Sequence, residues 1–179
     1  VSLVQTCIDP WKNWSRYKFN HLRTLIYHTD KTISENPDFI IWSESATLER
    51  LSYNYEQFIQ NGEELPMFDE MLYETVKRWN KPLLTGEIGK SYTLKDGKLF
   101  RQHFNNGSLI TSEGKLTQSY SKIHLVPFGE WFPYSDTFPF LVPLLDSMGA
   151  SKFSPGEKPS LFSLNGRKTI VSILEDISE

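Results

Sequence analysis

The segment Phe39-Ile40-Ile41-Trp42 is a short, continuous apolar run, the pattern of a strand that is buried on both faces. A helical pattern precedes it, because apolar residues recur at helical spacing from Trp14 to Ile33 and predict a helix that ends near Asn36-Pro37. A second helical pattern follows it, opened by Pro66, and its apolar face carries Phe68, Leu72, Val76 and Trp79. We therefore expect a buried strand between two helices.

Two further strand patterns complete an alternating order. Val1 to Ile8 is apolar and β-branched, and Asp9-Pro10 ends it. Lys81 to Gly86 has the pattern of a third buried strand. The order strand, helix, strand, helix, strand predicts an α/β fold with parallel neighbouring strands.

The second half of the chain has the pattern of antiparallel hairpins. Its turn signals are Asp96-Gly97, Asn106-Gly107 and, more weakly, Ser112-Glu113-Gly114. Asn165-Gly166 predicts a last hairpin between Ser160–Leu164 and Arg167–Leu174.

Composition excludes several classes of protein. The 179 residues include 19 basic and 22 acidic side chains, a formal net charge of -3, which excludes the broad basic surface of a nucleic-acid-binding protein. The 5 Trp, 8 Tyr and 12 Phe exclude an intrinsically disordered chain. A single cysteine, Cys7, excludes a disulfide framework and a multi-cysteine metal site. We expect no cofactor, and we interpret His21, His28 and His103 as structural because they lack metal-ligand spacing.

The segment from Tyr120 to Pro133 reads Y-S-K-I-H-L-V-P-F-G-E-W-F-P. It resembles, without a break, the Y-x-K-x-H-L-V-P-F-G-E-x-x-P signature of the bacterial apolipoprotein N-acyltransferases, members of the nitrilase (carbon-nitrogen hydrolase) superfamily. Other segments resemble the family in the same order, so the resemblance covers essentially the whole chain. They are Val1–Gln5, Ile40–Ala46 (the family's I-I-W-P-E-T-A), Leu83–Gly86 and Phe153–Gly156.

The resemblance implies a nitrilase-like αββα sandwich that is incomplete at its C-terminal side, with residues 1–179 forming a single partial domain. Both ends of the sequence fall inside strand patterns, which indicates a piece of a longer protein. Family members carry membrane spans before and after this domain. The resemblance therefore implies a location at the bacterial inner membrane, with this domain on the periplasmic side, and two substrates: a phospholipid acyl donor and a lipoprotein N-terminus.

The resemblance also implies a catalytic Glu-Lys-Cys triad. At the position of Glu44, a carboxylate takes the thiol proton and later that of the attacking amine. At the position of Lys122, an ammonium stabilises the oxyanion of each tetrahedral intermediate. Glu130 is expected to hold Lys122 charged and oriented, and His124 to make a structural hydrogen bond.

The chain departs from the family at the nucleophile. The family's I-C-[YF]-E motif aligns with Leu174 at the cysteine position or, one register earlier, with Ile173. Neither residue is a thiol, and an aliphatic side chain cannot form a thioester. Ser172 lies about 7 Å along the strand from position 174, and Cys7 follows the first strand, where a free cysteine is most often a small buried apolar residue. We therefore expect an inactive site.

Residues 131–155 are interpreted as an apolar, lid-like insertion. The part from Trp131 to Phe153 is rich in aromatic and aliphatic residues and is interrupted by prolines, which exclude one continuous helix. We expect it to contact the membrane surface, because a substrate with several acyl chains needs an apolar entrance. The alternative is a packed core loop.

Three functions stay open on the sequence alone. The first is an acyltransferase-family catalytic domain without its nucleophile, which the long signature and the apolar insertion favour. The second is a soluble amidase of the same superfamily. The third is a non-catalytic protein that binds lipid or lipoprotein, which the missing thiol favours.

Overall fold

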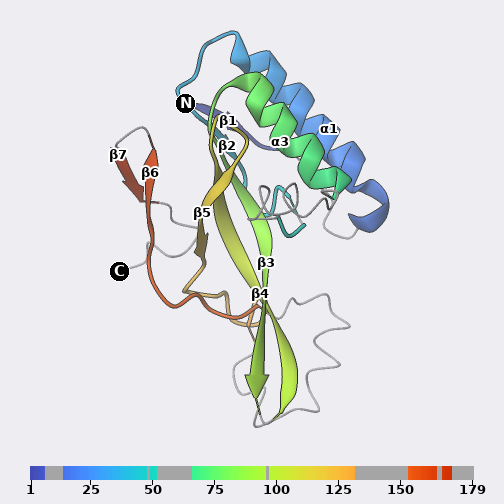
Figure 1. Cartoon of the computed structure of the whole chain (residues 1–179), viewed down its shortest axis with the longest axis vertical. Coiled ribbons are helices and arrows are strands. Elements are labelled where there is room, and N and C mark those ends of the chain that lie inside the picture. The colour runs from blue at the N-terminus through green and yellow to red at the C-terminus, as the bar shows by residue number, and fades with distance from the viewer. Residues whose placement is uncertain are drawn as a thin grey trace. The chain divides into compact units, whose positions relative to one another are not determined.

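The structure is a computed structural model that describes residues 1–6, 14–47, 49–51, 66–95, 97–131, 153–164 and 167–170. The chain forms two compact units. Figure 1 shows its helices and strands. Unit 1 comprises Val1–Ile88 and Asn106–Ser119, and unit 2 comprises Gly89–Asn105 and Tyr120–Glu179.

The main sheet has five strands in the order in which they occur in the chain. They are β1 (Ser2–Val4), β2 (Ile40–Trp42), β3 (Leu83–Lys95), β4 (Lys98–Ile110) and β5 (Leu116–Ser121). The pairs β1–β2 and β2–β3 are parallel, with Ser2 opposite Ile40 and Ile40 opposite Leu83. The predicted α/β fold with parallel neighbours is confirmed.

Two helices supply the apolar core of unit 1. Helix α1 spans Trp14–Ile33 and helix α3 spans Met67–Trp79. The face predicted for α3 is buried, and it packs in one cluster with Leu22 and Leu25 of α1 and with the buried residues of β1, β2 and β3. No helix among the described residues has the length and apolar character that a membrane crossing requires.

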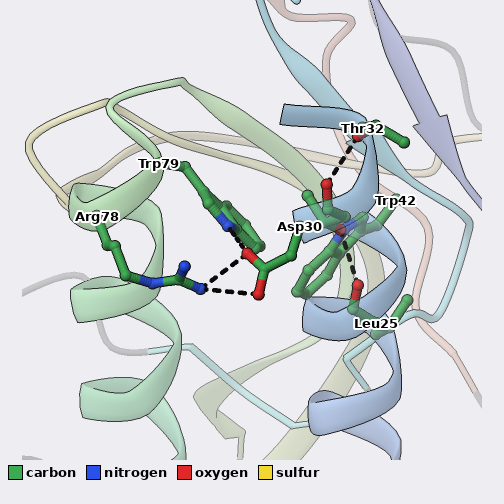
Figure 2. Close-up of polar contacts among 7 residues, drawn as sticks. Leu25, Asp30, Thr32, Trp42, Arg78 and Trp79 are labelled. Carbon is green, nitrogen blue, oxygen red and sulfur yellow. Dashed lines mark hydrogen bonds and ion pairs between the residues drawn. The ribbon is translucent and has the colours of Figure 1, made fainter. Parts of the chain in front are cut away.

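Polar contacts fix the two helices to each other and to the sheet (Figure 2). Asp30 of α1 accepts hydrogen bonds from Arg78 Nη2 at 2.9 Å and from Trp79 Nε1 at 2.6 Å, both on α3. The indole N–H of Trp42, on β2, donates to Thr29 Oγ1 at 2.9 Å. The indole N–H groups of the buried Trp42 and Trp79 are therefore satisfied, whereas the Arg78–Asp30 contact is exposed.

The turn predicted at Asn106-Gly107 is wrong, because both residues lie inside β4. The Asn106 side chain is buried there and donates to Glu87, so a tertiary contact holds the segment as a strand. The turn occurs at the weaker signal instead: Gly114 has a φ of 71°, and its N–H donates to the carbonyl of Thr111. Gly97, in the other predicted turn, also has a positive φ, of 72°.

The last predicted hairpin is confirmed in its strands. β6 (Leu161–Leu164) and β7 (Arg167–Ile170) pair antiparallel, with Leu164 opposite Arg167. The end of the predicted strand, from Val171 to Leu174, lies outside the described residues.

Candidate active site

Lys122 is a buried cation directly after β5. Its side chain is only 2% exposed, and its Nζ lies 3.0 Å from Oε2 of Glu130. Its backbone is held on both sides, because its N–H donates to the carbonyl of Asn105 and its carbonyl accepts from the N–H of Gly156, both at 2.8 Å. A charge is rarely buried without a partner, since desolvation costs several kcal/mol per ion. The predicted pairing of Lys122 with Glu130 is thus present in unit 2.

Glu130 is held by three donors from different parts of unit 2. Its Oε2 accepts the N–H of Val126 at 2.9 Å and faces Lys122, and its Oε1 accepts the Asn105 side-chain amide at 3.0 Å. Burial raises the pKa of Glu130, but the hydrogen bonds from Val126, Lys122 and Asn105 outweigh it, and the pKa lies below its ordinary value. Glu130 is therefore an ionised carboxylate beside the lysine.

A tight turn shapes the segment between the two ion-pair residues. The N–H groups of Glu130 and Trp131 both donate to the carbonyl of Val126, and Phe128 adopts a left-handed backbone with a φ of 64°. Such a backbone is uncommon for a residue other than glycine and is maintained only where surrounding contacts impose it. The turn returns the Glu130 side chain to the N–H of Val126.

Asn105 is a site residue that sequence reasoning missed. It lies on β4, is 3% exposed, and contacts both members of the ion pair: its carbonyl accepts from the Lys122 backbone and its side-chain amide donates to Glu130. The only signal in the sequence is its place next to Asn106-Gly107, a pair whose local pattern predicts a turn.

Glu44 follows β2 in unit 1, where its side chain is exposed. The segment that carries it packs closely on β3: Thr47 donates to the Gly86 carbonyl through its N–H at 3.0 Å and its hydroxyl at 2.8 Å. A Cβ on Gly86 would collide with the backbone nitrogen of Ser45. Gly86 is therefore required for the close approach of the Glu44 segment to the sheet.

Glu87 is a second residue that the sequence did not reveal. Its carboxylate is 1% exposed and accepts hydrogen bonds from the Leu51 N–H at 2.7 Å and the Ser108 hydroxyl at 2.6 Å. Burial raises the pKa of Glu87 above its ordinary value, although these hydrogen bonds oppose the shift. Gly86 and Glu87 thus attach Thr47 and Leu51 to β3, within unit 1.

The remaining predicted residues fall into two groups. His124 is exposed and lines a hollow of about 300 Å³ together with Ile123, Leu125, Trp131 and Pro155. Ile173, Leu174, Ser172 and Cys7 lie outside the described residues, as do positions 132–152 of the predicted lid. The structure thus joins Lys122 to Glu130, and the approach of Glu44 and position 174 to this pair stays a prediction.

Comparisons with known proteins agree on the type of fold. The amidase of Nesterenkonia sp. superposes with a TM-score of 0.55 and 15% identity, over 93% of this chain and 51% of that one. A cysteine-to-alanine mutant of the Nesterenkonia AN1 amidase, from the nitrilase superfamily, gives a TM-score of 0.55 at 16% identity over 93% of this chain and 52% of that one. The chain therefore has a nitrilase-type α/β fold and spans about half of these amidases.

Sequence comparison places the chain more narrowly. It is 31% identical to the apolipoprotein N-acyltransferase of Chlorobaculum tepidum over an alignment of 179 positions, which covers 93% of this chain and 32% of that protein. It is 32% identical to apolipoprotein N-acyltransferase 2 of Treponema denticola over 90% of this chain and 29% of that protein. No protein-family model matches it. The chain is a relative of the apolipoprotein N-acyltransferases and spans about a third of their length.

Proposed function

We propose that this chain forms the carboxylate and ammonium part of an apolipoprotein N-acyltransferase active site, with Glu44 as the base, Lys122 as the oxyanion-stabilising cation and Glu130 as the residue that orients Lys122. By family resemblance, its substrates are a phospholipid acyl donor and the free amine of a lipoprotein. The full protein would act at the bacterial inner membrane, with this domain on its periplasmic side.

The observation that carries the proposal is the buried Lys122–Glu130 pair. A lysine that is 2% exposed lies 3.0 Å from a carboxylate. A fixed ammonium in a site with little water stabilises a developing oxyanion more strongly than a solvated lysine does. This is the task that acyl transfer assigns to the lysine, because negative charge develops on the carbonyl oxygen in both of its steps.

Glu130 is poorly suited to act as the base. Its pKa is lowered, and its two oxygens already accept hydrogen bonds from Val126, Lys122 and Asn105. A carboxylate occupied in this way has little affinity for a further proton. Glu44, exposed at the end of a parallel strand, is the better candidate for proton transfer.

The chain as it stands is proposed not to form an acyl-enzyme. In the family reaction a thiolate attacks the ester carbonyl of the phospholipid, a thioester forms and the lysophospholipid alcohol leaves. Leu174 or Ile173 occupies the thiol position, so the first bond cannot form. The missing thiol also favours a second function, non-catalytic binding of lipid or lipoprotein by this chain.

Intact-mass spectrometry after incubation with phospholipid vesicles tests the proposal. We expect no acyl adduct on the chain itself and an adduct of one fatty-acyl mass on Leu174→Cys or Ile173→Cys that disappears with Lys122→Met. An adduct on the parent chain, or an adduct on the cysteine variants that survives Lys122→Met, would contradict the assigned roles. Cys7→Ser serves as the background for all variants, since it removes the chain's own thiol.

The apolar insertion at 131–155 is proposed as the lid through which acyl chains enter. Its composition supports this role, as does the hollow that Trp131 and Pro155 line together with Ile123, His124 and Leu125. Flotation of the chain on liposomes with and without residues 134–150 tests the lid. Equal partitioning of both proteins would favour the packed loop.

A further inference from the structure

The hairpin formed by the ends of β3 and β4 carries a surface that the proposed chemistry does not use. Figure 1 shows the two strands running side by side. Within unit 2 the hairpin spans Gly89–Asn105, which contains four basic residues and one acidic residue in a chain of net charge -3. It is therefore a local concentration of positive charge.

Hydrogen bonds define the polar face of this hairpin. The hydroxyl of Thr93, on β3, donates to Gln102 Oε1 at 2.6 Å, and the hydroxyl of Ser91 reaches the same oxygen at 3.5 Å. Gln102 in turn donates to the hydroxyl of Ser154 at 3.4 Å. Ser91, Thr93 and Gln102 thus lie on one face of the hairpin, which also meets residue 154.

Alternation along the strands places a different set of side chains on the opposite face. This face, which we call the Lys90–Arg101 face, consists of Lys90, Tyr92, Leu94, Leu99, Arg101 and His103. Tyr92, Leu94 and Leu99 are 56%, 70% and 67% exposed, which is unusual for three large apolar side chains on adjoining strands.

Two cations flank the exposed apolar side chains. Burial lowers the pKa of His103, and the positive charges of Arg101 and Lys90 lower it further, so both cations lie close enough to His103 to act on it. None of the six residues of the face is acidic. The face therefore combines exposed apolar side chains with positive charge.

We propose that the Lys90–Arg101 face binds the surface of an anionic phospholipid bilayer. Exposed leucines and a tyrosine gain from entering the boundary between headgroups and acyl chains, where a tyrosine ring has both an apolar and a polar environment. Lysine and arginine beside them are attracted to anionic headgroups. Charge complementarity thus selects an anionic bilayer over a neutral one.

This inference adds to the proposed function the place where the domain meets the bilayer that holds its acyl donor. It rests on the hairpin and needs neither the thiol nor Lys122. Its test compares vesicle binding of hairpin variants with that of the parent, whereas the tests of the proposed function measure an acyl adduct and the effect of removing residues 134–150, so each can fail alone.

The test is cosedimentation of the full chain with vesicles of phosphatidylcholine containing phosphatidylglycerol, and with vesicles of phosphatidylcholine alone. We expect binding to the anionic vesicles that weakens as salt is added. The double variant Lys90→Gln/Arg101→Gln should bind about 30-fold more weakly, as expected for the loss of two cations at a membrane surface. Leu94→Ser/Leu99→Ser should also weaken binding, including at low salt.

Matched variants on helix α1 provide the controls. Arg23→Gln/Lys31→Gln removes the same charge from exposed positions of unit 1, and Tyr17→Ser/Tyr27→Ser removes exposed apolar side chains there. Both controls should bind within a factor of about two of the parent, and circular dichroism should show all variants folded. Undiminished binding of the hairpin variants, an equal loss in the controls, or no binding of the parent to anionic vesicles would overturn the proposal.

Discussion

Replacing Glu130 with glutamine tests the buried ion pair directly. The substitution keeps the shape of the side chain and an oxygen that can accept from Val126, but it leaves the Lys122 ammonium, 2% exposed, without its carboxylate. Removing one partner of a fully buried pair costs about 3–5 kcal/mol. Because Glu130 itself is 15% exposed and water can approach it, we expect the lower end, about 3 kcal/mol in the free energy of unfolding at neutral pH.

The stability difference between the parent and Glu130→Gln should depend on pH. The pKa of Glu130 in the folded protein lies below its ordinary value of 4.5, so the folded state favours the ionised form. The stability that it contributes is complete above pH 4.5 and is lost as the pH falls through the folded pKa. The difference between the parent and Glu130→Gln should therefore be largest at neutral pH and should shrink in acid.

Urea unfolding followed by tryptophan fluorescence measures both effects. Glu74→Gln is the matched control, because it breaks the exposed Glu74–Lys77 pair on α3 and should cost no more than about 0.5 kcal/mol. A loss in Glu130→Gln as small as in this control, or a difference between parent and variant that does not change between neutral and acidic pH, would refute the reasoning.

Three further predictions concern Asn105, which contacts the Lys122–Glu130 pair, and Gly86 and Glu87, which hold the segment after β2. Asn105→Ala removes a donor from Glu130 and should lower the free energy of unfolding by about 1–2 kcal/mol, measured by urea unfolding, whereas an unchanged midpoint would show that water replaces the amide. Gly86→Ala places a Cβ against the Ser45 backbone and should lower the free energy of unfolding by about 1–3 kcal/mol in the same assay. The control Gly129→Ala, where a Cβ meets only ordinary contacts, should be nearly neutral. Equal effects of the two substitutions would show that the segment after β2 does not depend on Gly86 for its close approach to β3. The pKa of Glu87 is raised, so its contribution to stability is present below pH 4.5, its ordinary pKa, and declines as the pH rises through the folded pKa. Glu87→Gln should abolish that decline. An unchanged pH profile of the urea midpoint in this variant would contradict the assignment.

Much of unit 1 could be predicted from the sequence because its periodicity is strong. The apolar run at Ile40–Trp42 is a buried strand, and the spacing of Phe68, Leu72, Val76 and Trp79 matches the buried face of α3. In these segments the local hydrophobic pattern agrees with the tertiary burial, so the pattern alone is sufficient to predict the strand and the buried helix face.

Asn106-Gly107 shows where local pattern fails. The pair has a strong preference for a hairpin turn, but Asn106 is buried inside β4 and donates to the carboxylate of Glu87. That partner lies 19 positions earlier in the chain, and no local rule reveals it. Tertiary hydrogen bonding therefore decided the conformation.

The sequence predicted only part of the candidate site, because the other part depends on tertiary contacts. Lys122 and Glu130 lie in one continuous signature, which made their pairing predictable. Asn105 and Glu87 are isolated polar residues in strand patterns, and their roles depend on which side chains face them across the fold. A single sequence contains no record of those neighbours.

The central claim is that Glu44, Lys122 and position 174 form one reaction centre. Its most direct test is the separation of the Glu44 carboxylate, the Lys122 ammonium and the side chain at position 174 in a crystal structure of the chain. All three should lie within about 8 Å of one another, as residues that share a reacting carbonyl must. Glu44 and Lys122 on opposite faces of the domain would contradict it.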